Sequence, residues 1–378
     1  MVYRNFKDLQ ISALGLGTMR LPVIRGEDSA VDQAQVNEMV KMAVEGGVNY
    51  FDTAWGYHGG NSETSVAEAL QPYPRASYFL ADKFPGYDLA NFGKTKEIFA
   101  RQLEKCRTDY FDFYLFHNVC ELNISHYLDE EKWHTYSDLI RLRDEGKIRH
   151  LGFSCHGDMD VLQSFLNAYG KDMEFCQLQI NWIDWRFQNA GEKVELLNKW
   201  NIPVWVMEPL RGGKLASLRP EDGQKLHALR PGETVPAWAF RFLQSVPGVT
   251  VILSGMSSAG QLAENLRTFR DERPLNAEEW KTLTAIGDEM VKQIALPCTA
   301  CRYCVPHCPK HLDIPRLLSF YNEHVFTGGG FLAPMALASF DKDKLPSECI
   351  GCGSCRKVCP QGIDIPAAMK DFTAKVGA

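Results

Sequence analysis

The sequence lacks the features of several large classes of protein. No cluster of lysine or arginine is long enough to follow a nucleic-acid backbone, and the net charge of the 378 residues is −6, so we expect no nucleic-acid partner. Residues 1–9 lack the apolar run of a signal peptide, and no stretch approaches the roughly 20 apolar residues of a membrane span. We therefore expect a cytoplasmic protein that does not enter a membrane.

Cysteine is scarce in most of the chain: the first 297 residues contain four, whereas the last 81 contain eight. Because disulfides are rare in a reducing cytoplasm, closely spaced cysteines there are expected to bind metal. The composition, with 45% hydrophobic and 23% charged residues, is ordinary for a globular enzyme and excludes a disordered or low-complexity chain. The cysteine count alone therefore divides the chain into a large part and a small, different part.

Short apolar runs alternate with amphipathic helical stretches through the large part. Strands are predicted at residues 14–17, 48–52, 78–81, 111–116, 151–153, 175–179, 204–207 and 249–253. A helix is predicted after each strand, at residues 33–45, 64–70, 96–105, 136–144, 160–167, 193–200, 235–243 and 260–269. Eight strand–helix repeats in about 255 residues are typical of a (β/α)8 TIM barrel. The alternative is a doubly wound sheet, whose glycine fingerprint is incomplete because Arg20 stands where its third glycine would be.

A further amphipathic helix is predicted at about residues 277–292, and the composition changes at Pro297. We therefore predict a barrel over residues 1–275, a linking helix over residues 276–296 and a cysteine-rich domain over residues 297–378. Within that domain, Gly328-Gly329-Gly330 indicates a flexible connection between two halves.

The two halves of the cysteine-rich domain repeat each other. Each contains the spacing C-x2-C-x2-C-x3-C-P, and the copies are offset by 51 residues, as are two Asp-Ile-Pro segments at residues 313–315 and 364–366. The spacing resembles that of bacterial ferredoxins with two [4Fe–4S] clusters, in which the fourth cysteine of each run serves the other cluster. The resemblance implies one cluster on Cys298, Cys301, Cys304 and Cys359, and a second on Cys349, Cys352, Cys355 and Cys308. Two zinc sites are the alternative. Zinc binding, however, does not account for three evenly spaced cysteines followed by a fourth cysteine and a proline in both copies of the repeat.

Polar residues stand at the carboxyl ends of successive predicted strands. They are Asp52 after the second strand, Lys83 after the third, His117 after the fourth and Ser154 after the fifth, with Tyr57 on the same loop as Asp52. In a (β/α)8 barrel these ends and their loops form one open face, so the side chains should meet there. Taken singly, Asp52 could be a helix cap, and Lys83 and His117 could be structural. Their joint occurrence on successive strands favours a functional site.

This set of side chains suits the reduction of a carbonyl group. A hydride that reaches a carbonyl carbon creates an alkoxide that needs a proton, and a tyrosine hydroxyl can supply it if its pKa of about 10 falls toward neutrality. A lysine ammonium lowers that pKa, a carboxylate keeps the lysine charged, and a histidine can orient the carbonyl oxygen. The sequence therefore predicts a site for carbonyl reduction.

Four motifs resemble those of the aldo-keto reductases. They are Gly15-Leu16-Gly17-Thr18, Phe51-Asp52-Thr53-Ala54-Trp55-Gly56-Tyr57, Asp82-Lys83 and Leu115-Phe116-His117-Asn118. The resemblance spans about residues 1–275, and with the cysteine module the whole chain resembles the bacterial branch of that family fused to a [4Fe–4S] ferredoxin domain. It implies Tyr57 as the general acid, Lys83 and Asp52 as the pair that tunes it, and His117 as the residue that orients the carbonyl. Family members that reduce C=C bonds carry glutamate in place of this histidine, so an aldehyde or ketone is the expected substrate.

The resemblance also implies NADH or NADPH, bound extended across the barrel mouth without a Rossmann fold. The implied contacts are Gly17, Thr18, Met19 and Asp52 near the first strands, Ser154, Gln177 and Met207 at the nicotinamide, Pro209, Leu210 and Gly212 at the pyrophosphate, and Gly255, Met256, Gln261, Glu264 and Asn265 at the ribose and adenine. NADPH-specific relatives place cations where this chain has Gly255 and Gln261. We therefore expect no strong preference for NADPH, unless Arg267 or Arg270 reaches its 2′-phosphate.

Three hypotheses follow from the combination of a hydride cofactor with one-electron clusters. In the first, the enzyme reduces a carbonyl compound with a nicotinamide, and the clusters hold a small domain together. In the second, the clusters pass electrons from an electron-transfer protein to the barrel, with or without a flavin. In the third, the barrel is a nicotinamide-binding redox sensor with little turnover. The complete set of four motif residues counts against the third hypothesis, and the first is favoured.

Overall fold

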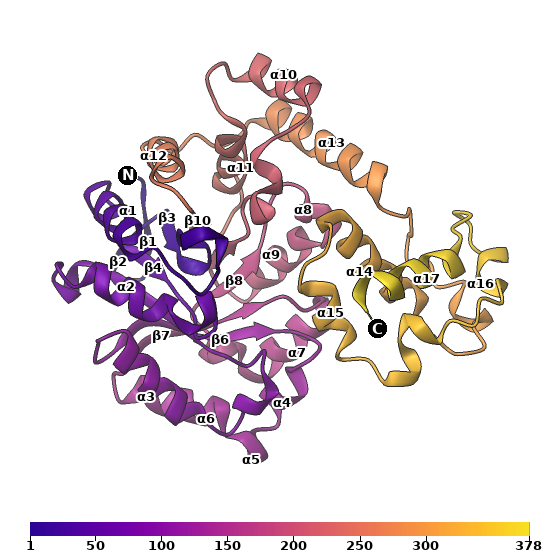
Figure 1. Cartoon of the computed structure of the whole chain (residues 1–378), viewed down its shortest axis with the longest axis horizontal. Helices are drawn as coiled ribbons and strands as arrows, with labels where there is room; N and C mark the ends of the chain where they lie inside the picture. Colours follow the sequence, from indigo (N-terminus) through magenta and orange to yellow (C-terminus); the bar gives the residue numbers. More distant parts are fainter. Residues whose placement is uncertain (378) are drawn as a thin grey trace. The chain divides into compact units, whose positions relative to one another are not determined.

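The structure, a computed structural model, describes residues 1–377 and divides into two compact units, Met1–Leu283 and a second that starts at Thr284. The first contains a closed barrel of parallel strands with helices around it, and the second consists of helices and loops (Figure 1). The boundary falls inside helix α13 (Ala277–Ile294), which lies in the segment predicted as a linking helix. None of the described helices is long and apolar enough to cross a membrane.

The barrel has eight parallel strands in the order β10-β3-β4-β5-β6-β7-β8-β9. Their bounds are β3 (Leu14–Gly17), β4 (Tyr50–Asp52), β5 (Phe79–Phe84), β6 (Phe111–Val119), β7 (Ile148–Cys155), β8 (Cys176–Gln179), β9 (Val204–Met207) and β10 (Val249–Gly255). Pairing of β10 with β3 closes the barrel. The predicted (β/α)8 TIM barrel is therefore confirmed, and all eight strands overlap the apolar runs of the sequence.

Helices connect the strands along the outside of the barrel. Those that overlap predicted helices are α1 (Gln33–Glu45), α2 (Ser62–Leu70), α3 (Thr95–Lys105), α6 (Thr135–Asp144), α7 (Met159–Tyr169), α9 (Ala190–Lys199), α11 (Val235–Gln244) and α12 (Ala259–Thr268). Sequence analysis does not anticipate α4 (Ile124–Leu128), α5 (Glu130–Trp133), α8 (Asp184–Phe187) and α10 (Pro220–Leu229). Local caps fix several helix starts; for example, Asp158 accepts a hydrogen bond from the Val161 N–H at 3.0 Å at the start of α7.

An N-terminal hairpin precedes the barrel. Its strands, β1 (Tyr3–Phe6) and β2 (Leu9–Ser12), pair antiparallel. The Phe6 ring lies edge-on to Trp205 with 5.0 Å between ring centroids, and Phe6 belongs to one buried cluster with Tyr50, Phe113 and Phe175 of the barrel strands. Aromatic side chains therefore fill the barrel interior, and the polar residues of the predicted site stand beyond them at the carboxyl ends of the strands.

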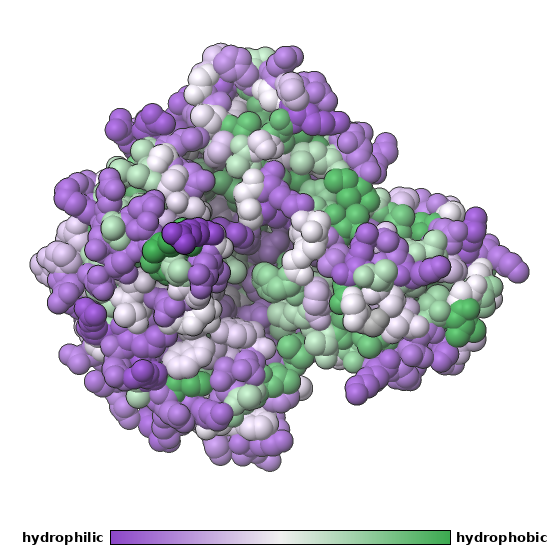
Figure 2. Space-filling view, viewed as in Figure 1, coloured by the Kyte–Doolittle hydropathy of each residue, from purple (hydrophilic) through white to green (hydrophobic). Residues whose placement is uncertain are grey.

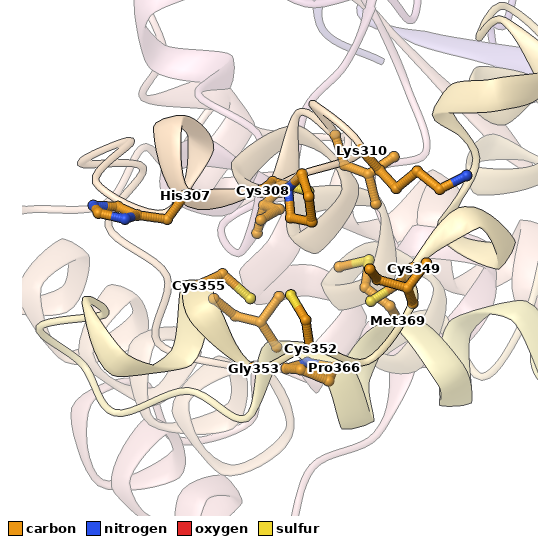
Figure 3. A pocket seen from close by; sticks show the side chains of 14 residues that line it. His307, Cys308, Lys310, Cys349, Cys352, Gly353, Cys355, Pro366 and Met369 are labelled. Atoms are coloured by element: carbon orange, nitrogen blue, oxygen red, sulfur yellow. The ribbon is translucent and has the colours of Figure 1, made fainter.

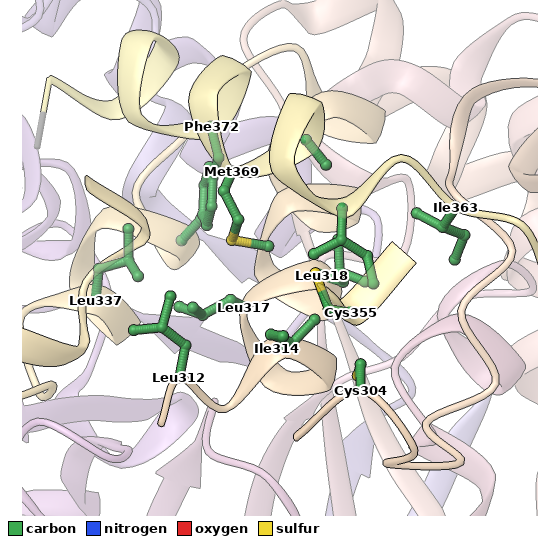
Figure 4. Packing of buried hydrophobic residues seen from close by; sticks show 13 residues of the cluster. Cys304, Leu312, Ile314, Leu317, Leu318, Leu337, Cys355, Ile363, Met369 and Phe372 are labelled. Carbon is green, nitrogen blue, oxygen red and sulfur yellow. The ribbon is translucent and has the colours of Figure 1, made fainter. Parts of the chain in front are cut away.

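The second unit contains two equivalent helices. Helices α14 (Ile314–Thr327) and α17 (Ile365–Val376) each begin after the aspartate of a repeated Asp-Ile-Pro segment, with the proline in the first turn. The short helices α15 (Leu332–Leu337) and α16 (Ser354–Lys357) complete the unit. Leu317 and Leu318 of α14 pack with Met369 and Phe372 of α17 in one buried core (Figure 4). The two halves of the sequence repeat therefore share a single core.

Candidate active site

Lys83 is the centre of a buried polar cluster at the carboxyl ends of β4 and β5. Its ammonium donates hydrogen bonds to Asp52 Oδ1 at 2.6 Å and to the Thr53 carbonyl oxygen at 2.6 Å. Both charged side chains are buried, Lys83 completely. Asp52 stands opposite Ala81 in the register of β4 and β5, so these two side chains share a face of the sheet. Lys83 is two residues after Ala81 and shares that face too, because side chains alternate along a strand. Asp52 and Lys83 therefore both point into the barrel.

Tyr57 and His117 complete this cluster. The centroid of the Tyr57 ring lies 5.1 Å from Lys83 Nζ and 6.1 Å from the centroid of the His117 ring, with 81° between the two ring planes. Tyr57 stands on the loop after β4, and His117 lies near the end of β6. The structure thus brings together Asp52, Tyr57, Lys83 and His117, the four residues predicted to be catalytic, and their roles remain a prediction.

Burial and the Lys83 charge set the pKa values of the cluster. Burial raises the pKa of Tyr57, and the Lys83 ammonium offsets that rise only in part. Burial works to lower the pKa of Lys83, but the negative charge of Asp52 and the Tyr57 phenol outweigh it and hold that pKa above its ordinary value. The pKa of Tyr57 therefore stays above its ordinary value. The phenol holds its proton at neutral pH, which is the form that a proton donor needs.

His117 is neutral at pH 7. Burial lowers its pKa well below the ordinary value, and the positive charge of Lys83 lowers the pKa further. The neutral ring carries one N–H donor, and its buried Nδ1 atom has no hydrogen-bond partner among residues 1–377. A neutral histidine beside Tyr57 can therefore hydrogen-bond a carbonyl oxygen that the phenol also reaches.

A pair of buried acids lies behind Lys83, on the outer face of β5. The Lys83 backbone N–H donates to Asp82 Oδ1 at 2.8 Å, and Asp82 is completely buried beside Glu63 of α2. Burial raises the pKa of Asp82 well above its ordinary value, and the charge of Glu63 raises it further. Lys105 of α3 forms an ion pair with Glu63. This network connects the strand that carries Lys83 to two helices, and so holds the lysine backbone in place.

Ser154 and Gln177 are neighbours at the ends of β7 and β8. They stand opposite each other in the strand register, and both are buried. Ser154 Oγ accepts a hydrogen bond from the Asn118 backbone N–H at 2.8 Å, whereas Gln177 Oε1 has no partner in the described part of the chain. Met207 ends the adjacent strand β9. The predicted nicotinamide contacts therefore share one arc of the barrel mouth.

The predicted contacts near the first strand differ in exposure. Thr18 is buried, and its hydroxyl donates to the Asp52 carbonyl oxygen at 2.9 Å, so this side chain ties β3 to β4. Met19 is exposed, and Gly17 stands opposite Gly255 in the register of β3 and β10. Thr18 thus acts within the fold, and Met19 is free to contact a ligand.

The remaining predicted cofactor residues lie on neighbouring parts of the mouth. Pro209, Leu210 and Gly212 follow β9, Gly255 ends β10 and Met256 follows it, and Gln261, Glu264 and Asn265 lie on α12. The three polar side chains of α12 brace this region internally. Gln261 accepts a hydrogen bond from the Ser257 N–H at 2.8 Å, and Glu264 accepts one from the Thr234 hydroxyl. Asn265 donates a hydrogen bond to Ser254 Oγ at 3.1 Å. Their contact with a cofactor remains a prediction.

The eight C-terminal cysteines surround two cavities in the second unit. One cavity is lined by Cys308, Cys349, Cys352 and Cys355, which stand on different sides of it in Figure 3. The other is lined by Cys298, Cys301, Cys304 and Cys359. Each cavity combines three cysteines of one run with the fourth of the other run, the grouping that the sequence predicts. Among residues 1–377, no three His, Cys, Asp or Glu side chains converge as a site for a single metal ion would require.

Comparison with known families decides the assignment of the barrel. The sequence model of the Aldo/keto reductase family matches residues 13–288, a range that includes all four clustered residues. The chain belongs to the aldo/keto reductase family. It is thus an oxidoreductase. A second model, of the 4Fe-4S dicluster domain, matches residues 297–363 of this reductase, so the expected combination of the two modules is confirmed.

Several known proteins resemble the reductase. It is 26% identical to the uncharacterized oxidoreductase YqkF of Bacillus subtilis over 309 residues, which cover 73% of this chain and 92% of that protein. It is 27% identical over 232 residues to the NADH-specific methylglyoxal reductase of Escherichia coli, which covers 57% of this chain and 68% of that protein. The holo form of an aldo-keto reductase from Bacillus halodurans shares its structure with a TM-score of 0.62 and 25% identity, over 76% of this chain and 96% of that one.

Sequence analysis misses several residues of the reductase site. The Tyr87 ring centroid lies 5.3 Å from that of His117, and an aromatic residue four positions after the strand-end lysine was an available signal for it. The acids Asp82 and Glu63 meet through packing of a strand against a helix, which the sequence pattern does not show. Arg20 and Glu208 likewise meet across two loops, 3.8 Å apart, and no local motif marks their pairing.

Proposed function

We propose that this reductase transfers a hydride from NADH or NADPH to the carbonyl carbon of an aldehyde or ketone, and catalyses the reverse oxidation. The observation that carries the proposal is the buried Lys83–Asp52 pair directed at the Tyr57 phenol, with neutral His117 beside it. Methylglyoxal, the substrate in the name of the Escherichia coli relative, belongs in the first panel of carbonyl compounds to be tested.

Each member of the cluster has a separate task in this reaction. The nicotinamide, when bound, supplies the hydride. Tyr57 donates its hydroxyl proton to the carbonyl oxygen, and the Lys83 ammonium stabilises the phenolate that remains. Asp52 keeps Lys83 charged and in position through the hydrogen bond of 2.6 Å. His117 donates an N–H to the same oxygen and orients the carbonyl group.

The residues at the ends of β7 and β8 fit a nicotinamide. Its carboxamide has an N–H donor and a carbonyl acceptor, and a buried amide oxygen without a partner costs free energy until a donor reaches it. Gln177 Oε1 is such an atom, with the buried Ser154 hydroxyl as its neighbour. We propose that these two side chains hold the carboxamide, so that the ring faces the Tyr57 cluster.

We further propose that the two cysteine-lined cavities hold two [4Fe–4S] clusters. Four cysteines line each cavity, which is the ligand number of such a cluster. Cys304 and Cys355 are buried members of the core of the second unit, in contact with Leu312 and Ile314 among others. Loss of the clusters would therefore leave buried thiols around two voids in a small core, so metal binding contributes directly to the folding of this unit.

The exchange of the fourth ligand can be tested with two double variants. Wild-type protein purified without oxygen is expected to contain about eight iron atoms per chain. Cys298→Ser with Cys359→Ser removes two ligands of one cluster, so about four iron atoms should remain. Cys298→Ser with Cys308→Ser removes one ligand of each, and should lower the iron content toward zero and weaken thermal stability. Iron and sulfide assays with electron paramagnetic resonance spectra measure both outcomes.

If the four cysteines of each run instead bind one cluster, without exchange of the fourth, the results of the two double variants should be reversed. Both contain Cys298→Ser, so a general effect of that substitution cancels in the comparison. Cys120→Ala, at a buried barrel cysteine outside both sets, is the control and should retain all the iron. Equal iron loss in the two double variants would also contradict the proposed ligand sets.

The match to a 4Fe-4S dicluster domain favours a second candidate function. In it, the clusters accept electrons from an electron-transfer protein and pass them to the barrel, which makes the enzyme a ferredoxin-linked oxidoreductase. Protein reduced with dithionite should then convert substrate in the absence of any nicotinamide. Turnover that depends strictly on NADH or NADPH supports the first function instead.

A further inference from the structure

Arg20 is the last residue of the turn Thr18–Arg20, which follows β3 on the rim of the barrel. Its backbone carbonyl accepts a hydrogen bond from Ser257 Oγ at 2.9 Å, which ties this turn to the loop after β10. The side chain is 47% exposed, so the backbone is fixed while the guanidinium reaches solvent. Arg20 is therefore a positioned but accessible cation at the barrel mouth.

Two glycines leave the space that the Arg20 side chain occupies. A Cβ atom on Gly255 would lie 3.2 Å from Arg20 Cβ and 3.4 Å from Arg20 Cδ, and a Cβ atom on Gly212 would lie 3.2 Å from Arg20 Nη2. The alkyl part of Arg20 thus lies along Gly255, and its charged end lies beside Gly212. Gly212 lies on the loop expected to contact the pyrophosphate, and Gly255 ends β10, where the ribose and adenine are expected, so Arg20 lies between these two regions.

The resident partner of Arg20 is a weak one. Glu208 Oε1 lies 3.8 Å from Arg20 Nη2, and both side chains are accessible to solvent. Such exposed pairs contribute little to stability, so a better anion can replace the carboxylate at low cost. Glu208 itself is held in place, because its backbone carbonyl accepts from Asn181 Nδ2 at 3.1 Å and from the Arg211 N–H at 3.0 Å. The carboxylate therefore marks a position for negative charge beside Arg20.

We propose that Arg20, on the turn that follows β3, binds the pyrophosphate of the nicotinamide dinucleotide. This inference rests on the proposed nicotinamide-dependent function. A guanidinium forms two parallel charge-assisted hydrogen bonds with a phosphate, which an isolated carboxylate at 3.8 Å does not provide. On binding, the phosphate takes the place of Glu208 next to Arg20.

The position of Arg20 also fixes which phosphate it contacts. Its charged end lies by Gly212, on the loop after β9 where the pyrophosphate is expected, whereas the 2′-phosphate of NADPH is expected near Gln261 on α12. Arg267, the alternative cation of the sequence analysis, lies at the last turn of α12, about 12 Å of helix rise beyond its first residue. Arg20 thus acts on NADH and NADPH alike.

Direct binding measurements with purified holoprotein test this assignment. Titration of NADH, NADPH and ADP-ribose, followed by protein fluorescence or calorimetry, gives dissociation constants for the wild type, Arg20→Gln and the surface control Arg101→Gln, at an exposed arginine of α3 that pairs with Glu104. Arg20→Gln should raise the dissociation constants of all three ligands by a similar factor, about tenfold to a hundredfold, because each contains the pyrophosphate. Arg101→Gln should leave them unchanged, and Glu208→Gln should lower them, because it removes the competing carboxylate.

The possible outcomes separate this inference from the function on which it rests. If wild-type protein binds the ligands and Arg20→Gln binds them within twofold of the wild type, the role of Arg20 is overturned and the proposed function stands. A rise confined to NADPH would overturn the pyrophosphate assignment in favour of the 2′-phosphate. If the wild type binds neither dinucleotide, both the proposed function and this inference fail. Retention of iron content and melting temperature shows that each variant is folded.

Discussion

Replacement of Tyr57 by phenylalanine is expected to lower kcat for carbonyl reduction by about 10²–10⁴-fold, the usual contribution of a positioned proton donor. Phenylalanine keeps the ring and its packing against His117, so the iron content and melting temperature should stay close to those of the wild type. The measurement is the steady-state oxidation of NADH and of NADPH with a panel of aldehydes and ketones.

Tyr87→Phe is the matched control for this experiment. Its ring lies 5.3 Å from the His117 ring between centroids, so the variant loses a hydroxyl from the same neighbourhood, at a residue that has no part in the proposed proton transfer. We expect a change in KM for some substrates and less than a tenfold change in kcat. Equal activity of Tyr57→Phe and wild type would remove Tyr57 from the proposed reaction.

Lys83→Met is expected to damage both stability and activity. The Lys83 ammonium is completely buried and holds Asp52 at 2.6 Å, so its removal leaves a buried carboxylate without a cation. Breaking one side of a buried ion pair costs about 3–5 kcal/mol in the free energy of unfolding. The Tyr57 phenolate also loses its stabilising charge, so we expect kcat to fall by at least about tenfold, the value of one charge-assisted hydrogen bond.

The double variant Lys83→Met with Asp52→Asn separates the two effects. It removes the unpaired charge, so chemical denaturation should show that much of the lost stability returns, while kcat stays low. Recovery of activity together with stability would show that the pair is structural. Full stability of Lys83→Met alone would contradict the buried ion pair itself.

Sequence periodicity anticipates the barrel well because its strands and helices follow one another in a regular order. Apolar runs such as residues 204–207 are buried strands, and the rule that functional residues stand at strand ends brings Asp52, Lys83 and His117 to one place. The grouping of the eight cysteines around two cavities is the one implied by the resemblance of their spacing to that of two-cluster ferredoxins. These features depend on local pattern and on a regular topology.

Other features depend on contacts that no local pattern shows. The hairpin β1–β2 is short, and its place depends on long-range contacts such as the packing of Phe6 against interior rings. The direction of the Tyr57 pKa depends on the balance between burial and the Lys83 charge, which requires the three-dimensional arrangement. The position of Arg20 between two glycine-containing loops likewise requires coordinates, because its neighbours are almost two hundred residues or more away in the sequence.

The central claim, that a hydride passes directly from the nicotinamide to a carbonyl carbon beside Tyr57, can be tested with a deuterium label. Anaerobically purified protein is given NADH or NADPH labelled at C4 of the transferred face, together with a carbonyl substrate from the panel, and the alcohol is examined by mass spectrometry. We predict one deuterium atom on the carbon that carries the new hydroxyl group. Unlabelled alcohol, or alcohol formed by dithionite-reduced protein without nicotinamide, would contradict the account and assign the electrons to the clusters.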